Sequence, residues 1–112
     1  MKIANFAILG CVSLLAGCSM TLPVKGLIQS SSETFTGVAT GYLDGGGDLK
    51  IVSSRGVSCE GSFVYVTRRQ GRGIFTCSDN RTGPFDFVST GTRGSGTGDM
   101  SNGERLIFTF GD

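Results

Sequence analysis

Apolar and polar residues alternate along most of the chain beyond residue 33. The strongest example is the segment 57–67, where Cys59, Phe63 and Tyr65 fall on one face and valines on the other. A segment that is apolar on both faces in its middle is typical of a strand inside a sheet. The same two-residue period predicts further strands at 34–43, 49–51, 73–77, 85–87 and 104–110.

Short runs of glycine, aspartate and asparagine separate these segments. Residues 44–47 read Asp-Gly-Gly-Gly, and Asn102 with Gly103 forms the strongest short hairpin signal. The chain has 19 glycines, well above the usual share of about 7%. No sustained helical period follows residue 18. The sequence therefore predicts an all-β fold, a small antiparallel meander of about six to eight strands that closes into a barrel or a sandwich.

A weak repeat runs through the second half of this pattern. Two Gly-x-Gly motifs open predicted strands, and a Phe-x-Phe motif lies in the strand after each: Gly71 and Gly73 before Phe85 and Phe87, and Gly96 and Gly98 before Phe108 and Phe110. The repeat fits duplicated hairpins. It also fits the order of residues common to any hairpin, which we favour.

The first residues of the chain follow a different plan. Lys2 supplies a positive charge, residues 3–15 are almost wholly apolar, and the small residues Ala16 and Gly17 follow. That order predicts a secretory signal peptide. The apolar run is too short for a permanent transmembrane helix, which needs about 20 residues.

A short motif ends this leader. The four residues up to Cys18 read Leu-Ala-Gly-Cys, which resembles, residue for residue, the lipobox of bacterial lipoproteins. The resemblance covers residues 1–18 and implies cleavage before Cys18, a diacylglycerol on its thiol and usually an acylated amine. In Gram-negative lipoproteins an aspartate at the next position marks retention in the inner membrane, so Ser19 implies the outer membrane. The alternative is an ordinary signal peptide with a chance cysteine.

Three parts of the chain follow from these patterns. Residues 1–17 are the predicted signal peptide, 18–33 a lipidated N-terminus with a flexible tether, and 34–112 the β-rich domain. The tether is predicted from Pro23, Gly26, a run of three serines and weak periodicity.

The cysteines have different predicted fates. Cys11 leaves with the signal peptide and Cys18 carries lipid, so Cys59 and Cys77 remain in the folded part. Export delivers them to an oxidising compartment, where such a pair normally forms a disulfide. A redox-active or metal-binding pair is the alternative, but the cysteines are far apart in sequence and the chain has no histidine.

Composition limits the chemistry. Without histidine the chain has neither a Ser-His-acid triad nor a Cys-His pair, and a usual zinc site is not expected. Ten Lys and Arg nearly balance nine Asp and Glu, so no basic excess points to nucleic acid. The carboxylates of Asp44 and Asp48 offer acid–base chemistry, but turn aspartates usually bond their own backbone. We predict a non-catalytic domain without metal or cofactor.

One cluster of charge stands out. Arg68, Arg69 and Arg72 surround a predicted hairpin tip. Guanidinium groups pair well with carboxylates and phosphates, so the cluster is a candidate contact patch for an envelope protein or an anionic envelope polymer. The alternative is a solvated turn, because hairpin tips are exposed and tolerate charge.

The favoured function is a lipid-anchored lipoprotein of the cell envelope, with a β-domain for binding or structural support, held in the outer membrane and facing the periplasm. The alternative is a small periplasmic inhibitor of a hydrolase such as lysozyme. Residues 59–65 are similar to the early cysteine strand of membrane-bound C-type lysozyme inhibitors, although the tryptophan and the Ser-Ala-Ser-Gly-type loop of that family are missing. An enzyme that uses carboxylates alone is a third hypothesis.

Overall fold

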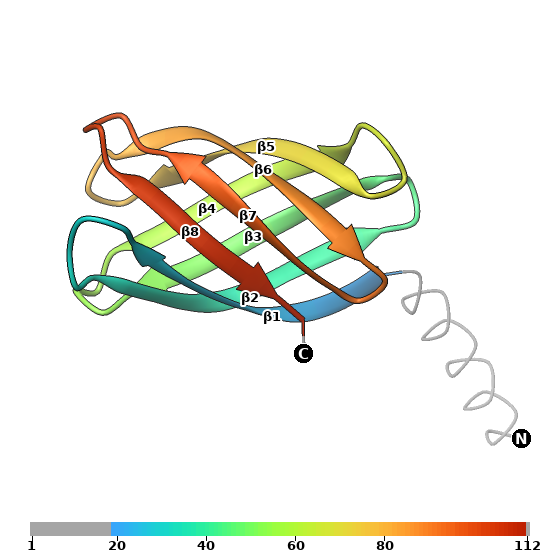
Figure 1. Cartoon of the computed structure of the whole chain (residues 1–112), viewed down its shortest axis with the longest axis horizontal. Coiled ribbons are helices and arrows are strands. Elements are labelled where there is room, and N and C mark those ends of the chain that lie inside the picture. Colours follow the sequence, from blue (N-terminus) through green and yellow to red (C-terminus); the bar gives the residue numbers. More distant parts are fainter. Residues whose placement is uncertain (1–18, 112) are drawn as a thin grey trace, which may run out of the picture.

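A computed structural model describes residues 19–111, and they form a closed up-and-down barrel of eight antiparallel strands (Figure 1). Each strand pairs with the next, and β8 pairs with β1 to close the barrel. This confirms the all-β meander and decides between barrel and sandwich. Among residues 19–111, no helix is long and apolar enough to cross a membrane. The strands are β1 (Ser19–Ile28), β2 (Thr34–Tyr42), β3 (Gly46–Ser53), β4 (Ser58–Tyr65), β5 (Gln70–Cys77), β6 (Thr82–Thr90), β7 (Arg93–Asp99) and β8 (Arg105–Phe110).

The predicted flexible tether is wrong for most of its length. Ser19–Ile28 form β1, which pairs with β2 on one side and with β8 on the other. Its inward residues Val24 and Ile28 are buried, with 2% and 0% of their surface exposed. Pro23 and Gly26 weaken the local strand pattern, so the strand forms because both neighbours pair with it. Cys18 and the predicted signal peptide lie outside the described residues.

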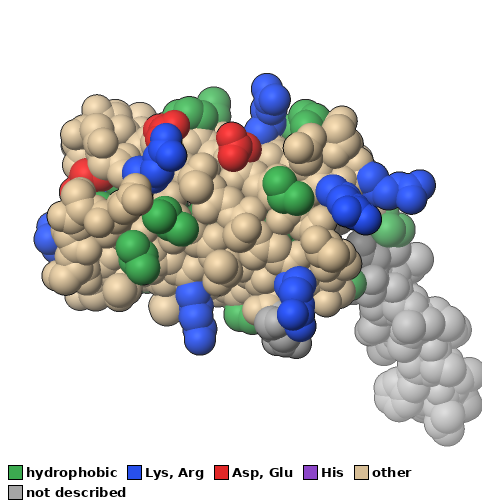
Figure 2. All heavy atoms as spheres, in the orientation of Figure 1, with side chains coloured by type: hydrophobic (Ala, Val, Ile, Leu, Met, Phe, Trp, Pro, Cys, Tyr) green, Lys and Arg blue, Asp and Glu red, His purple; other side chains and the backbone are tan. Residues whose placement is uncertain are grey.

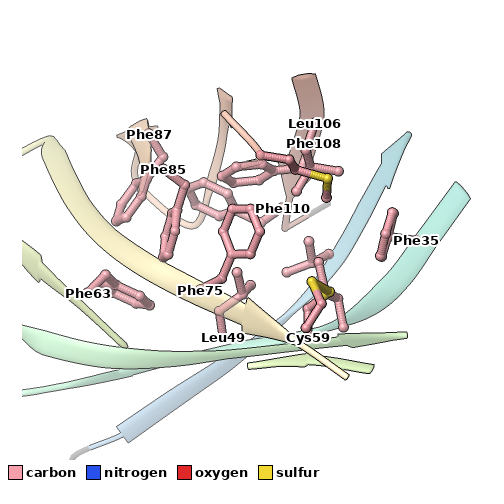
Figure 3. Packing of buried hydrophobic residues seen from close by; sticks show 14 of the residues in the cluster. Phe35, Leu49, Cys59, Phe63, Phe75, Phe85, Phe87, Leu106, Phe108 and Phe110 are labelled. Atoms are coloured by element: carbon pink, nitrogen blue, oxygen red, sulfur yellow. A yellow bond between two sulfur atoms is a disulfide. The ribbon is translucent and has the colours of Figure 1, made fainter. Parts of the chain in front are cut away.

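The interior of the barrel alternates phenylalanine with glycine across neighbouring strands. Gly96 pairs with Phe108, and Gly73 pairs with Phe85. A Cβ atom on Gly96 would lie 2.5 Å from the Phe108 ring, and one on Gly73 would lie 2.8 Å from the Phe85 ring. Figure 3 shows these rings pointing into the interior. An eight-stranded barrel is narrow, so a phenylalanine ring fits only where the neighbouring strand has glycine at its inward positions. This explains why a Gly-x-Gly motif in one strand accompanies a Phe-x-Phe motif in the next.

The inward glycines differ in how much space a Cβ atom would find at each position. In Gly96→Ala the new methyl would meet the Phe108 ring and the carbonyl oxygen of Asp86, so we expect a loss of about 1–3 kcal/mol of unfolding free energy. Gly41→Ala is the control, because a Cβ there meets no atom within 4 Å. Chemical denaturation measures both, and equal stabilities for the two variants would contradict this packing.

The disulfide is confirmed. Cys59 of β4 and Cys77 of β5 are register partners and are bonded in the structure. Both are buried, with 1% and 4% of their surface exposed. The barrel, its core and this disulfide lie wholly within residues 19–111, so a chain that begins at Ser19 retains every element of the fold.

Candidate functional site

The two ends of the barrel differ in chemistry. At one end lie the connections 29–33, 54–57, 78–81 and 100–104, and at the other lie the turns 43–45, 66–69 and 91–92 with the beginning of β1. In Figure 1 the second end is on the right, where β1 begins. We call the first the closed end and the second the open end.

A buried ion pair between Arg81 and Glu33 fills the closed end, and we call this pair with its hydrogen-bond partners the plug. The Nη1 and Nη2 of Arg81 donate to the two carboxylate oxygens of Glu33, both at 2.9 Å, and its Nε donates to Asp79 at 2.8 Å. Nη1 also donates to Glu104 at 3.0 Å. The guanidinium lies 5.9 Å from the centre of the Phe35 ring. The side chains of Arg81 and Glu33 are 10% and 0% exposed, so this end is sealed by charges that compensate one another.

The hydrogen bonds of the plug favour the charged forms of both Glu33 and Arg81. Hydrogen bonding to Arg81 lowers the pKa of Glu33 below its ordinary value, although burial opposes the shift. Hydrogen bonding to Glu33 raises the pKa of Arg81 in turn. No buried side-chain nitrogen or oxygen of the described residues lacks a hydrogen-bond partner. A saturated ion pair has no spare group for acid–base work, so we assign this network to stability.

Acidification should weaken the plug through Glu33. Because its folded pKa is lowered, the stability it contributes is fully present above the ordinary value of 4.5 and is lost as the pH falls through the folded value. We expect the Tm to fall as the pH drops below about 4.5, with a shallower fall for Glu33→Gln. Calorimetry across this range measures both slopes, and identical slopes would contradict the assignment.

An apolar pocket of about 320 Å³ occupies the open end. Leu22, Leu49 and the rings of Phe63, Phe87 and Phe110 contribute to its wall. The Phe87 ring lies edge-on to those of Phe63 and Phe110, with centroids 5.1 and 5.5 Å apart. These rings leave the pocket unfilled because each already packs on a glycine of a neighbouring strand. An eight-stranded barrel of this kind has room for one small ligand.

A few polar groups stand at the rim of the pocket. The hydroxyl of Tyr65 lies 3.4 Å from that of Ser89, which donates to the carbonyl oxygen of Arg69 at 3.3 Å. Ser89 is only 5% exposed. The Tyr42 hydroxyl faces away from the pocket: it donates to Asp48 on the outer wall at 2.9 Å, and this contact raises the pKa of Tyr42. Tyr65 and Ser89 thus supply hydroxyl groups beside a wall that is otherwise mostly apolar.

The structure divides the predicted arginine patch. Arg68 and Arg69 lie in the loop between β4 and β5 at the open end, whereas Arg72 lies on the outer wall of β5 opposite Asp86. Arg93, the first residue of β7, also lies near the open end, but on the outer face of its strand, because the next residue, Gly94, faces the Phe110 ring inside the barrel. Figure 2 shows Lys and Arg side chains at this end and elsewhere on the visible face, and acidic side chains near its middle and toward the other end.

The candidate carboxylates of Asp44 and Asp48 have different hydrogen-bond partners. Asp44 accepts a hydrogen bond from the backbone N–H of Gly46 at 2.9 Å, which is the turn role expected for it. Asp48 accepts from Tyr42 and lies 3.4 Å from the hydroxyl of Ser62. Within residues 19–111, no group of three or more acidic or cysteine side chains is placed to hold a metal ion.

Comparisons with solved structures find designed proteins. A redesigned β-barrel, mFAP1, bound to DFHBI matches with a TM-score of 0.68 and 16% identity, over 82% of this chain and 92% of that chain. Another redesigned β-barrel matches with a TM-score of 0.66 and 18% identity, over 88% and 93%. A de novo designed fluorescence-activating β-barrel matches with a TM-score of 0.61 and 15% identity, over 80% and 88%. No protein-family model and no curated protein matches the chain. At these identities the chain shares with the designed proteins the β-barrel fold alone.

Proposed function

We propose that this protein is a non-catalytic binding module of the cell envelope, anchored by lipid at Cys18, whose barrel holds a small apolar ligand at its open end. The pocket carries the proposal. Its wall is aromatic and aliphatic, it opens at one end of the barrel, and the other end is sealed by the ion pair between Arg81 and Glu33. Pockets of a few hundred Å³ with apolar walls and a few polar groups are typical of small-molecule sites.

The position of Ser19 supports an orientation for the anchored protein. Ser19 contributes to the rim of the pocket and begins β1, directly after the predicted lipidation site at Cys18. With no flexible tether between anchor and barrel, acyl chains on Cys18 would hold the open end against the membrane surface. The ligand would then enter from the bilayer side. Intact-mass analysis of the protein from its host tests the lipid.

Pocket binding is tested by closing the pocket. Gly41 lines it, and a Cβ at this position meets no atom within 4 Å. A phenylalanine in Gly41→Phe can therefore enter the cavity without displacing the fold. We expect saturable binding of 1-decanol to the chain from residue 19, and a loss of affinity of about tenfold or more in Gly41→Phe, measured by calorimetric titration.

A matched variant separates occupation of the pocket from a general effect of the new ring. Val38→Phe places the same side chain on the outer, 40% exposed face of the same strand. It should bind 1-decanol as the unaltered chain does. The proposal fails if no saturable binding is seen, or if both phenylalanine variants bind as tightly as the parent.

The alternative function, inhibition of a periplasmic hydrolase such as lysozyme, stays a prediction. A lysozyme inhibition assay tests it directly.

A further inference from the structure

We infer that the ligand of the pocket is a single-chain amphiphile with an anionic head, whose tail enters the barrel and whose head lies beside Arg68 and Arg69. The inference rests on the proposed function and names the chemical class of its ligand. It joins two features of the open end, the apolar cavity and the cationic rim.

The charges around the rim are mostly positive. Among the described residues, the turns at the open end hold two arginines, Arg68 and Arg69, and one acidic residue, Asp44, which accepts a hydrogen bond from the backbone N–H of Gly46 in its own turn. Both arginines are exposed and form no ion pair within the described part of the chain. At the closed end, by contrast, Arg81 is matched by three carboxylates. Unmatched guanidinium groups beside an opening favour an anionic group there.

The cavity itself excludes a charged head. The side chains of its deeper wall, such as Leu49, Phe85 and Phe108, are apolar and buried. A charge placed among them would lose its hydration without a partner, which is costly. An amphiphile therefore has one favourable orientation, with the tail inward and the head at the rim.

The volume of the cavity suits a single alkyl chain. A volume of about 320 Å³ accommodates on the order of ten non-hydrogen atoms, if each takes about the 30 Å³ that a water molecule occupies in the liquid. That is one medium-length alkyl chain. The two chains of a bilayer lipid together exceed this volume, which favours a single-chain molecule such as a fatty acid.

Three ligands that share a decyl or similar ten-carbon tail and differ in the charge of the head group test the proposed anionic head. We expect decanoate to bind about three- to tenfold more tightly than 1-decanol, and decyltrimethylammonium to bind more weakly than either, as titrated by calorimetry at low salt. The preference for decanoate over 1-decanol should shrink as salt is added, because exposed charges are screened.

A charge-matched pair of variants locates the effect. Arg68→Gln with Arg69→Gln should remove most of the preference for decanoate and leave 1-decanol binding unchanged. Lys50→Gln with Arg55→Gln removes the same charge away from the open end and should leave the preference intact. Equal effects of the two pairs would overturn the assignment of the head site.

Other outcomes separate the two proposals. If 1-decanol binds and Gly41→Phe blocks it, but decanoate binds no better, the anionic ligand is wrong and the pocket stands. If no decyl compound binds, both proposals fail. If decanoate does not bind but the chain sediments with phosphatidylglycerol vesicles through Arg68 and Arg69, the arginines contact a membrane surface and the inference is overturned.

Discussion

Arg81→Met should reduce the free energy of unfolding by about 3–5 kcal/mol, the cost typical of removing one partner of a buried ion pair. Methionine keeps the unbranched stem of the side chain as far as Nε but removes the guanidinium group, so the carboxylate of Glu33, which is 0% exposed, loses its two 2.9 Å hydrogen bonds. Chemical denaturation near neutral pH, where Glu33 is charged, measures the loss.

A double-mutant cycle separates the stranded charge from the lost packing. In Glu33→Leu with Arg81→Met no buried charge remains, so we expect the double variant to be more stable than Arg81→Met alone. Replacing a whole buried ion pair by apolar residues is often neutral or stabilising. If the double variant loses the sum of the two single losses, Glu33 and Arg81 do not act as a pair and the plug is misassigned.

Reducing the disulfide should cost about 3 kcal/mol, because Cys59 and Cys77 are 18 positions apart and the bond constrains the unfolded chain. For a domain of this size the Tm should fall by about 12–24 °C. The protein is unfolded with reductant, refolded and compared with the oxidised form by calorimetry, because the buried sulfur atoms are poorly accessible in the barrel.

The double variant Cys59→Ala with Cys77→Ala is the control for the reductant. Its Tm should lie near or below that of the reduced protein, and reductant should not change it. If reduction leaves the Tm of the unaltered chain within about 3 °C of the oxidised form, which is under 1 kcal/mol, the bond contributes little. The stability would then come from packing and strand pairing alone.

Much of the fold could be predicted because the alternation of apolar and polar residues along a strand shows which of its faces is buried. Cys59, Phe63 and Tyr65 alternate with polar or exposed residues, and the structure places them on the inner face of β4. Asn102 and Gly103 gave a turn in the correct place, between β7 and β8. The Cys59–Cys77 disulfide also followed, because only these two cysteines remained for the fold.

The candidate site was predicted only in part. The charge at Arg68 and Arg69 predicts a charged hairpin tip, but no local pattern indicates that this tip lies at the end of the barrel that holds an apolar pocket. Arg81 lies between the predicted strands 73–77 and 85–87, and Glu33 is the last residue of the predicted tether. They are 48 positions apart and meet because the closed end gathers the connections between strands.

The sequence by itself determined local properties, namely which residues are strands, which are turns, and which face of each strand is apolar. These depend on neighbours two or three positions away along the chain. Tertiary structure alone decided that β1 is a strand, that the sheet closes, and that one end is plugged while the other stays open. Those outcomes depend on pairing between distant segments and on the space that phenylalanine rings leave inside the barrel, which no local pattern records.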